Sequence, residues 1–383
     1  MRIEEALLTF KEQFKIISKI QKILLNMNEE NYESLTSSLN DFPIFEDKHI
    51  FCHFLESIDS AIYARPKKFR IYVNLILLFK EKIKLYLNQD ELFHIFGSHI
   101  VNFHLFINSF YTTDFILSIC KNDEVVSMIF KPFFEFIKSD NEIELYKFKE
   151  NCLKGENPNK IAHSLRNDDV VTLQYLLSHS NLDINMKISR SIFEISYILY
   201  EEPTLIEYAA FFQSFECFKY LFMQENIKIT PQLSKFAVAG GNYSIIHLFE
   251  NRKIKFTADD LNTAVQFHQN EVAEYLRESF EIDDKNNESL FTSITYYNIR
   301  YFTKHINEVL NINIKNKFNS TLLHTAAFYG QYDLTLFLLN IDGIDLDARA
   351  DFNRTPIQVA EEMGENEIVY LIKSFKENSK KRK

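Results

Sequence analysis

Glycine and proline are scarce in this 383-residue chain, with seven residues of each, and tryptophan is absent. Tight hairpins and glycine-rich phosphate loops depend on glycine and proline, so the composition argues against folds built from them. The phosphate-loop, dinucleotide-binding, GxSxG, HExxH and EF-hand patterns are all missing. The sequence therefore predicts an all-α fold of helices joined by short turns, with no catalytic residue and no bound cofactor.

Long apolar runs and closely spaced cysteines are also missing. No stretch reaches the ~18 apolar residues of a membrane span, and the most apolar one, residues 71–79, lies between Arg70 and Lys80. Glu4 and Glu5 interrupt the apolar run that a secretory signal needs. The four cysteines form no CxxC pair, which is typical of reduced thiols. We expect a soluble, cytoplasmic protein without a transmembrane segment.

The chain has no surplus of positive charge. Its 43 Lys and Arg stand against 53 Asp and Glu, for a net charge of −10, which argues against a nucleic-acid partner. The one basic cluster is "KKRK" at residues 380–383. A nuclear-import signal would explain it, but a solvated end is the simpler interpretation, so we expect a basic disordered tail at 377–383.

Histidines with metal-ligand spacing occur in one place. His49 and His53 lie four residues apart, with Cys52 and Glu56 nearby. A zinc site needs three or four converging ligands, and the sequence indicates no others here. We expect half-buried helix histidines and no metal.

Two segments near the end of the chain repeat each other. "TLLHTAAFYGQYDLTLFLL" (321–339) aligns with "TPIQVAEEMGENEIVYLIK" (355–373) at an offset of 34 residues. Threonine caps a helix start, proline fits the first helical position, and glycine allows the left-handed turn at the helix end. The paired alanines let neighbouring helices approach closely. Each unit is therefore predicted to be a pair of helices, the inner one carrying the alanines.

Similar units occur upstream, beginning with "TLIEYAAFFQSFECFKYLF" (204–222). Their small residues fall at positions 209, 237, 264, 293, 326 and 360, with steps of 28, 27, 29, 33 and 34. A divergent first copy is expected near residues 160–178. The residues assigned to the repeat motif are Thr204, Ala209, Ala210, Ala237, Gly241, Ala264, Thr321, His324, Ala326, Ala327, Gly330, Thr355, Pro356, Ala360 and Gly364.

The motif T-P-L-H-x-A-A-x-x-G followed by an amphipathic run resembles the ankyrin repeat. Residues 155–376 resemble the degenerate ankyrin domain of unassigned function that is abundant in ankyrin proteins of protist parasites. The resemblance implies an ankyrin-like helical solenoid of six to seven repeats, the middle ones shortened, in which His324 ties helix turns together by hydrogen bonds. Gln213 and His268 stand where glycine is usual, and Leu322 where proline is usual, which leaves the local turn geometry open.

Residues 1–154 show no repeat and resemble the helical region that commonly precedes such arrays. Ile3, Leu7, Phe10, Phe14 and Ile17 form one apolar stripe. We expect a helical N-terminal domain that caps the first face of the array. Self-association through the first helix is an alternative to ordinary core packing, although Gln21 interrupts the heptad pattern.

The resemblance implies a non-enzymatic scaffold or adaptor that binds proteins through the concave face and the finger tips of the solenoid. One alternative is an adaptor subunit of a ligase or other enzyme complex with its effector part in residues 1–154. Another is a membrane-skeleton adaptor.

Two fingers, the hairpin connections before full-length repeats, form the candidate partner-binding site. Asn319 and Asn353 occupy the place where ankyrin hairpins carry glycine, so Phe318 and Phe352 fall on the tips. Aromatic residues are enriched in interface hot spots. The alternative is that the two rings cover each other. The charged residues of the same fingers complete the candidate set: Lys315, Lys317, Arg349, Asp351 and Arg354.

Overall fold

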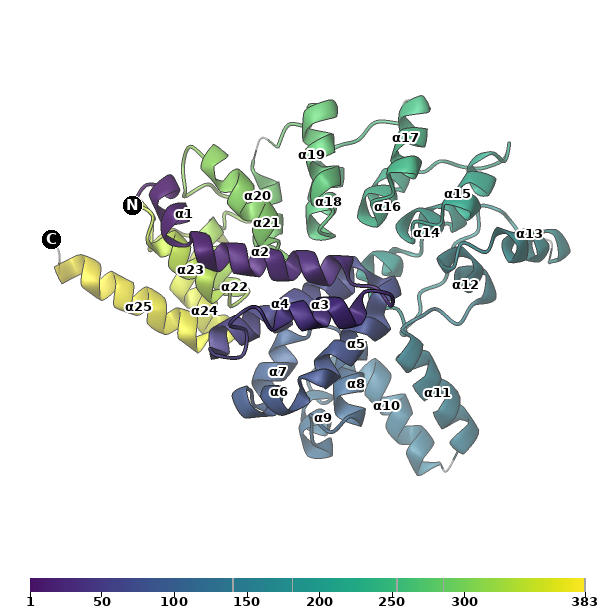
Figure 1. Ribbon diagram of the computed structural model, residues 1–383, viewed down its shortest axis with the longest axis horizontal. Helices are drawn as coiled ribbons and strands as arrows, with labels where there is room; N and C mark the ends of the chain where they lie inside the picture. Colours follow the sequence, from purple (N-terminus) through teal and green to yellow (C-terminus); the bar gives the residue numbers. More distant parts are fainter. Residues whose placement is uncertain (140, 181, 253, 285, 382–383) are drawn as a thin grey trace. The chain divides into compact units, whose positions relative to one another are not determined.

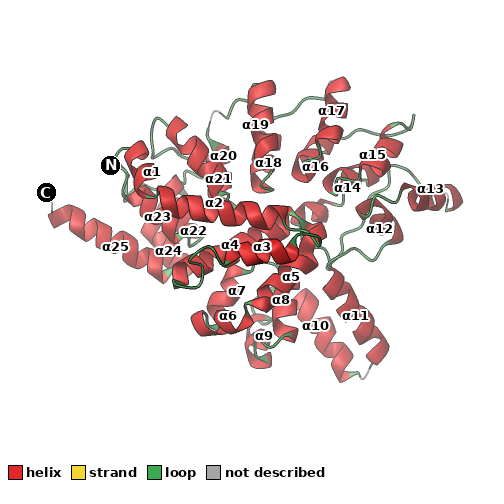
Figure 2. Ribbon diagram, in the orientation of Figure 1, coloured by secondary structure: helices red, strands yellow, loops and turns green. Residues whose placement is uncertain are grey.

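The structure is a computed structural model that describes residues 1–139, 141–180, 182–252, 254–284 and 286–381 (Figure 1). These residues form helices and loops without a β-strand (Figure 2). Two isolated bridges join Lys187 to Thr204 and Lys315 to Thr321. The all-α prediction is confirmed.

The chain forms two compact units. Unit 1 contains Met1–Lys19 and Phe256–Lys383, and unit 2 contains Ile20–Lys255. The divisions therefore fall within the second helix and between two repeats, and the boundary predicted at residue 154 lies inside unit 2. A repeat array has no strong internal boundary, because each repeat contacts only its neighbours.

Unit 2 begins with a helical bundle. The ring of Phe103 lies 5.7 Å from that of Phe130, 5.1 Å from Phe133 and 5.9 Å from Phe148, which joins α8 to α10 and α11. The bundle helices are α3 (Tyr32–Leu39), α4 (Lys48–Ala64), η1 (Pro66–Lys68), α5 (Phe69–Leu78), α6 (Lys80–Tyr86), α7 (Gln89–Ile95), α8 (His99–Ile107), α9 (Thr113–Ile119), α10 (Glu124–Lys138) and α11 (Glu142–Lys154).

Three helix pairs follow in unit 2, and their inner helices α12, α14 and α16 stack on one another. The bundle contacts the first pair: Arg166 donates a hydrogen bond to the Pro66 carbonyl at 2.8 Å. The helices are α12 (Lys160–Arg166), α13 (Val170–His179), η2 (Tyr197–Glu201), α14 (Leu205–Phe211), α15 (Phe215–Phe222), α16 (Leu233–Gly240) and α17 (Tyr243–Asn251).

Unit 1 contains four further pairs, with inner helices α18, α20, α22 and α24 stacked in the same way. Outer helix α23 also packs on α25. The helices are α18 (Ala258–Gln266), α19 (Asn270–Ser279), α20 (Glu288–Thr295), α21 (Ile299–His305), η3 (Ile306–Glu308), α22 (Leu322–Phe328), α23 (Tyr332–Leu339), η4 (Asp351–Asn353), α24 (Pro356–Met363) and α25 (Asn366–Lys381).

Each inner helix ends at a residue with positive φ, which lets the chain turn into the outer helix. Gln213 (φ 58°) and His268 (φ 52°) adopt the conformation that glycine would have at this place, so the turn geometry left open by the sequence is the ankyrin-like one. Seven such residues mark seven helix pairs in the described residues, and they are Asp168, Gln213, Gly241, His268, Tyr297, Gly330 and Gly364.

The N-terminal residues pack on the repeats of unit 1. The predicted first helix is broken at Phe10 into α1 (Ile3–Thr9) and α2 (Lys11–Asn26). Phe10 and Phe14 join one core cluster with the repeats, and the Phe14 ring lies 5.4 Å from that of Phe337 on α23. The Asp342 amide donates to the Met1 carbonyl at 2.8 Å. The stripe is therefore used for core packing within unit 1.

The predicted disordered tail and the predicted lack of a membrane span can be compared with the helices of the structure. Helix α25 runs to Lys381 and extends into the segment predicted as a disordered tail, while Arg382 and Lys383 lie outside the described residues. Within the described ranges, no helix combines the length and the apolar character that crossing a membrane requires.

Candidate partner-binding surface

The finger before α22 is a narrow hairpin. Lys315 and Thr321 form its isolated bridge, and the Asn316 amide donates to the Ser320 carbonyl at 3.0 Å. Asn319 has φ 54°, as predicted for the glycine position of the turn. The tip residue Phe318 is 56% exposed, and the ammonium group of its neighbour Lys317 lies 5.1 Å from the ring centroid.

The finger before α24 repeats this arrangement. The Ala350 amide donates to the Arg354 carbonyl at 3.0 Å, and Asn353 has φ 58°. Phe352 precedes it in the left-handed conformation as well, at φ 58° and ψ 21°. Its side chain is 89% exposed, and the Arg354 guanidinium lies 5.2 Å from the ring centroid. Each finger thus presents a phenylalanine beside a cation.

Several candidate residues hold the two fingers together. Lys315 donates to the Arg349 carbonyl at 2.8 Å. The Asp351 amide donates to the Phe318 carbonyl at 3.1 Å, and its carboxylate accepts from the Asn319 amide group at 2.8 Å. These contacts make the pair of fingers one ordered surface.

The other two charged candidates bond within their own repeat. Arg349 donates to the Asn353 carbonyl at 2.8 Å, and Arg354 forms an ion pair with Glu362 at 2.7 Å. Lys317, Phe318 and Phe352 are therefore the candidate side chains that extend most freely from the fingers.

His324 connects the inner helix to the next finger. Because a carbonyl only accepts, Nε2 carries the proton and donates to Arg354 O at 3.0 Å, while Nδ1 accepts from the Thr321 amide at 3.2 Å. Burial lowers the pKa of this imidazole, against the opposing effect of its hydrogen bond to Arg354. With both ring nitrogens engaged, His324 joins the start of α22 to the following finger.

The other motif residues lie at helix starts and in the packed interior of the repeats. Thr321 and Thr355 cap α22 and α24 with their side chains, and Pro356 begins α24. Thr204 stands at the N-cap of α14, where its amide donates to the Glu207 carboxylate at 2.7 Å and its own hydroxyl oxygen has no partner among the described residues. The motif alanines have no exposed surface; they are Ala209, Ala210, Ala237, Ala264, Ala326, Ala327 and Ala360.

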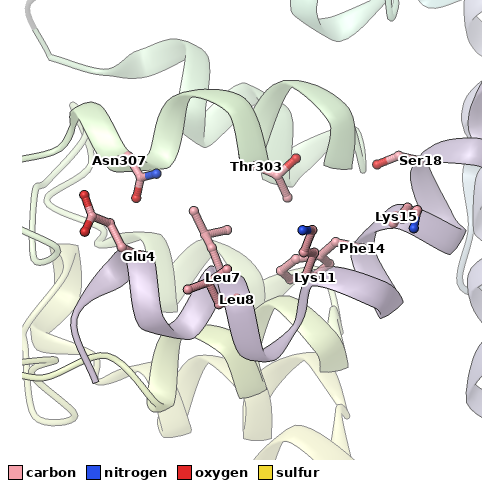
Figure 3. A pocket seen from close by; sticks show the side chains of 9 residues that line it. All are labelled: Glu4, Leu7, Leu8, Lys11, Phe14, Lys15, Ser18, Thr303 and Asn307. Atoms are coloured by element: carbon pink, nitrogen blue, oxygen red, sulfur yellow. The ribbon is translucent and has the colours of Figure 1, made fainter.

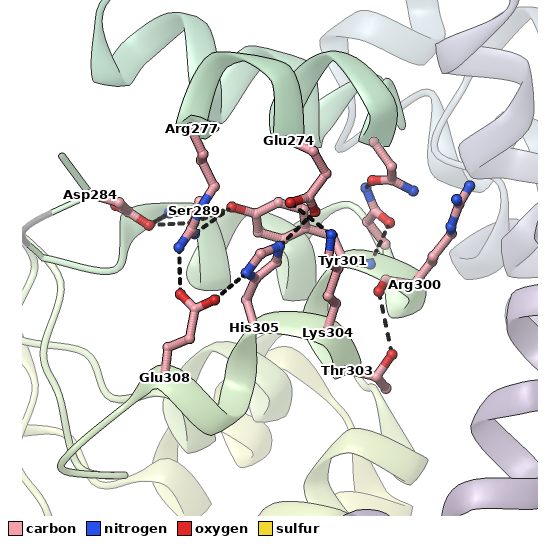
Figure 4. Close-up of polar contacts among 12 residues, drawn as sticks. Glu274, Arg277, Asp284, Ser289, Arg300, Tyr301, Thr303, Lys304, His305 and Glu308 are labelled. Carbon is pink, nitrogen blue, oxygen red and sulfur yellow. Dashed lines mark hydrogen bonds and ion pairs between the residues drawn. The ribbon is translucent and has the colours of Figure 1, made fainter. Parts of the chain in front are cut away.

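A polar network of unit 1 connects α19 to α21 and η3 (Figure 4). The buried His305 ring has Glu274 2.7 Å from Nε2 and Glu308 2.7 Å from Nδ1. Glu308 also pairs with Arg277, which donates to the Tyr301 hydroxyl at 3.2 Å. Both imidazole nitrogens are occupied from opposite sides, so the carboxylates do not converge on a common point. The network fastens the fourth repeat to the fifth.

Metal ligands do not gather elsewhere in the described residues, where no group of three or more His, Cys, Asp and Glu could hold an ion. His53 lies on α4 with its Nδ1 3.1 Å from Glu56. All four cysteines are free thiols, and burial raises the pKa of Cys152 to about 12. Its thiol is therefore protonated at neutral pH.

Sequence reasoning missed two features that matter to these surfaces. Gly240 was not assigned a role, yet a Cβ there would overlap the Ala210 carbonyl oxygen of the preceding inner helix. The doubled glycine in "AVAGG" is the signal, since Gly241 alone accounts for the turn. The packing of α1 on the repeats was also missed, although "YDLTLFLL" of α23 lacks the polar face of an exposed outer helix.

Two family models match the chain. The one described as a domain of unknown function (DUF3447) matches residues 224–305, and the one described as an ankyrin repeat matches residues 318–348. No match is found among curated proteins. The predicted resemblance to ankyrin proteins with a domain of unknown function is confirmed.

Two solved structures illustrate the likeness. The chain is 14% identical to the human ASB11 ankyrin repeat domain, with a TM-score of 0.39, over 56% of this chain and 97% of that one. It is 17% identical to a chain from the complex of the Bd0816 predatory endopeptidase of Bdellovibrio bacteriovorus with immunity protein Bd3460, with a TM-score of 0.29, over 57% and 99% of the two chains. Because both TM-scores are low, the assignment depends on the family models and the repeat geometry.

Proposed function

We propose that this ankyrin-repeat protein is a non-enzymatic scaffold or adaptor that recognises a partner protein through the tips of the two fingers before α22 and α24. The proposal depends on one observation, the exposed ring of Phe352 on a left-handed backbone. Its left-handed backbone costs on the order of 1 kcal/mol for a bulky residue, and its 89% exposed ring recovers little of this by burial. Such a residue is better explained by contact with a partner than by folding.

The surroundings of the ring support the same proposal. Cross-finger hydrogen bonds order the surface before binding, which lowers the entropic cost of association. At 89% exposure Phe352 is not covered by Phe318, which disfavours the alternative in which the two rings shield each other. The four free thiols suit a reducing compartment, and we propose that the protein acts in the cytoplasm.

The test replaces both tip residues. In the double variant Phe318→Ser/Phe352→Ser, we expect capture of the partner from extracts of the native organism to weaken by more than ~10-fold, which corresponds to ~1.4 kcal/mol. The melting temperature should stay nearly unchanged, because both rings are exposed. Quantitative mass spectrometry of the captured proteins and a thermal melt give the two measurements.

A matched control removes two exposed aromatic rings elsewhere, as Tyr146→Ser/Tyr370→Ser. This variant should capture the same proteins as the unmodified chain. Equal capture by the tip variant, or its unfolding, would contradict recognition by the fingers and direct attention to the inner-helix face.

A further inference from the structure

A groove runs along unit 1 between the N-terminal helices and the outer side of the fifth repeat (Figure 3). One wall is formed by α1 and the start of α2, and the other by Thr303 of α21 and Asn307 of η3. Its volume is about 490 Å³. The residues that line it on the first wall extend from Glu4 to Ser18, which at 1.5 Å per helical residue is a length of about 20 Å. The first wall is therefore long, whereas the second wall contributes two residues one turn apart, Thr303 and Asn307.

The floor of the groove is apolar. Phe14 is buried, Leu7 is half-buried and Leu8 is 69% exposed, so the side chains form a graded apolar strip. The two leucines of α1 and the phenylalanine of α2 leave apolar surface that folding has covered only in part. An apolar strip of this kind suits a complementary apolar side chain.

The charges along the groove are uneven. Lys11 makes no ion pair within the described part of the chain, and Lys15 has only an exposed i,i+3 pair with Glu12 at 3.2 Å, a type of contact that contributes little. The two lysines lie one turn apart, beside the apolar floor. Glu4 is the carboxylate at the opposite end. In a chain of net charge −10, this cationic stretch favours an anionic partner.

We infer that the groove binds an acidic amphipathic helix of a partner protein, about four turns long. The apolar face of that helix, with side chains at i, i+3 or i+4, and i+7, packs on Leu7, Leu8 and Phe14, and its carboxylates pair with Lys11 and Lys15. A first wall about 20 Å long, formed by residues from Glu4 to Ser18, matches a helix lying along it better than a compact ligand. The site is separate from the fingers and stands independently of the function proposed for them.

The experiment uses the full chain and fluorescein-labelled synthetic peptides of 14 residues as probes, in fluorescence anisotropy titrations. One peptide is an amphipathic helix with leucines on one face and glutamates beside them; the others are its lysine counterpart and a scrambled acidic sequence. We expect the acidic helix to bind at least ~10-fold more tightly than either, and more weakly as salt is raised. In Lys11→Glu/Lys15→Glu, the preference should reverse toward the lysine peptide.

Two controls locate the site. Lys121→Glu/Lys138→Glu makes the same charge change at exposed lysines of unit 2 and should leave binding unchanged, as should Phe318→Ser/Phe352→Ser. Circular dichroism checks that each variant is folded, and Leu8→Asp, at an exposed position, should weaken binding without relying on the lysines. If the acidic helix shows no saturable binding, the proposal is overturned. An equal loss of affinity in Lys11→Glu/Lys15→Glu and in Lys121→Glu/Lys138→Glu would overturn it as well. So would binding of the protein to phosphatidylserine vesicles without binding to any peptide.

Discussion

Asp59 on α4 is a half-buried carboxyl whose hydrogen-bonding capacity is satisfied only in part. Its Oδ1 is buried and has no hydrogen-bond partner. Burial, with the nearby charge of Glu56, raises the pKa of Asp59 to about 8, and a backbone hydrogen bond from Gly97 opposes this only partly. The folded protein therefore holds a proton on Asp59 at neutral pH, whereas the unfolded chain, with an ordinary pKa near 4, does not.

The pH dependence of stability follows from this difference. A raised carboxyl pKa means that the folded state binds more protons between pH ~4 and ~8, so the free energy of unfolding falls as pH rises through this window. Asp59→Asn removes the titration. We expect the variant to gain about 2–4 kcal/mol relative to the unmodified chain between pH 5 and pH 8, measured by urea denaturation at both values. Asp41→Asn, which changes an exposed carboxyl, is the control. If the stability of the Asp59 variant changes with pH in the same way as that of the unmodified chain, the raised pKa of Asp59 is contradicted.

Helix α16 packs unusually close to α14, and Gly240 makes the approach possible. A Cβ on Gly240 would overlap the Ala210 carbonyl oxygen and lie 2.9 Å from that of Phe211. Both obstacles are backbone atoms, which have no rotamer to change. The two helices can therefore accommodate an added methyl group only by separating.

Because of this contact, we expect Gly240→Ala to change stability in the direction opposite to that given by helix propensity. Alanine normally stabilises a helical position by ~1 kcal/mol relative to glycine. Gly240→Ala should instead lower the free energy of unfolding by ~1–3 kcal/mol, because the helices are overpacked. The comparison is Gly364→Ala, where nothing lies within 4 Å and only the backbone at φ +80° resists, at a cost of ~1 kcal/mol. Stabilisation by Gly240→Ala in chemical denaturation would show that the helices separate at no cost.

Local spacing explains why so much of each repeat is visible in the sequence. Ala326 and Gly330 stand at fixed offsets within one helix and its turn, so an internal alignment finds them together with their copies at Ala360 and Gly364. The left-handed Asn319 was likewise predictable from its place in the hairpin. The hydrogen bond of Lys315 was not predictable, because its acceptor, the Arg349 carbonyl, belongs to the next finger. The distance between the two groups depends on how the repeats stack.

The largest surprise concerns the arrangement of unit 1 as a whole. Phe14 and Phe337 are far apart in the chain but in contact in the structure. Neither local sequence pattern predicts that the apolar stripe of residues 3–17 packs on α23. Residues 1–19 share the core of unit 1 with the later repeats. The outer helix α23 is largely buried, because Phe10 and Phe14 pack against Phe337 and α25 packs on it as well.

Removing this cover predicts a loss confined to unit 1. In Phe10→Ala/Phe14→Ala, two buried rings are lost from the core cluster, and each such change typically costs ~3–5 kcal/mol. We expect amides of α21 and α23 to exchange hydrogen much faster, measured by mass spectrometry, while α14 and α15 stay protected. Leu8→Ala changes an exposed side chain and should have little effect. Unchanged exchange in α23 would mean that the N-terminal segment is not part of its core.

The packing of Phe14 on Phe337 has a consequence for how the protein is made. A ribosome adds about 5–20 residues per second, so roughly 15–65 s separate the synthesis of the two residues. During that time the nascent chain carries an amphipathic segment whose partner helix does not yet exist, while all of residues 20–255 have already emerged and can begin to fold. Phe10 and Phe14 are thus translated long before the helix on which they pack, and through that interval their apolar side chains depend on chaperones or on temporary contacts for protection.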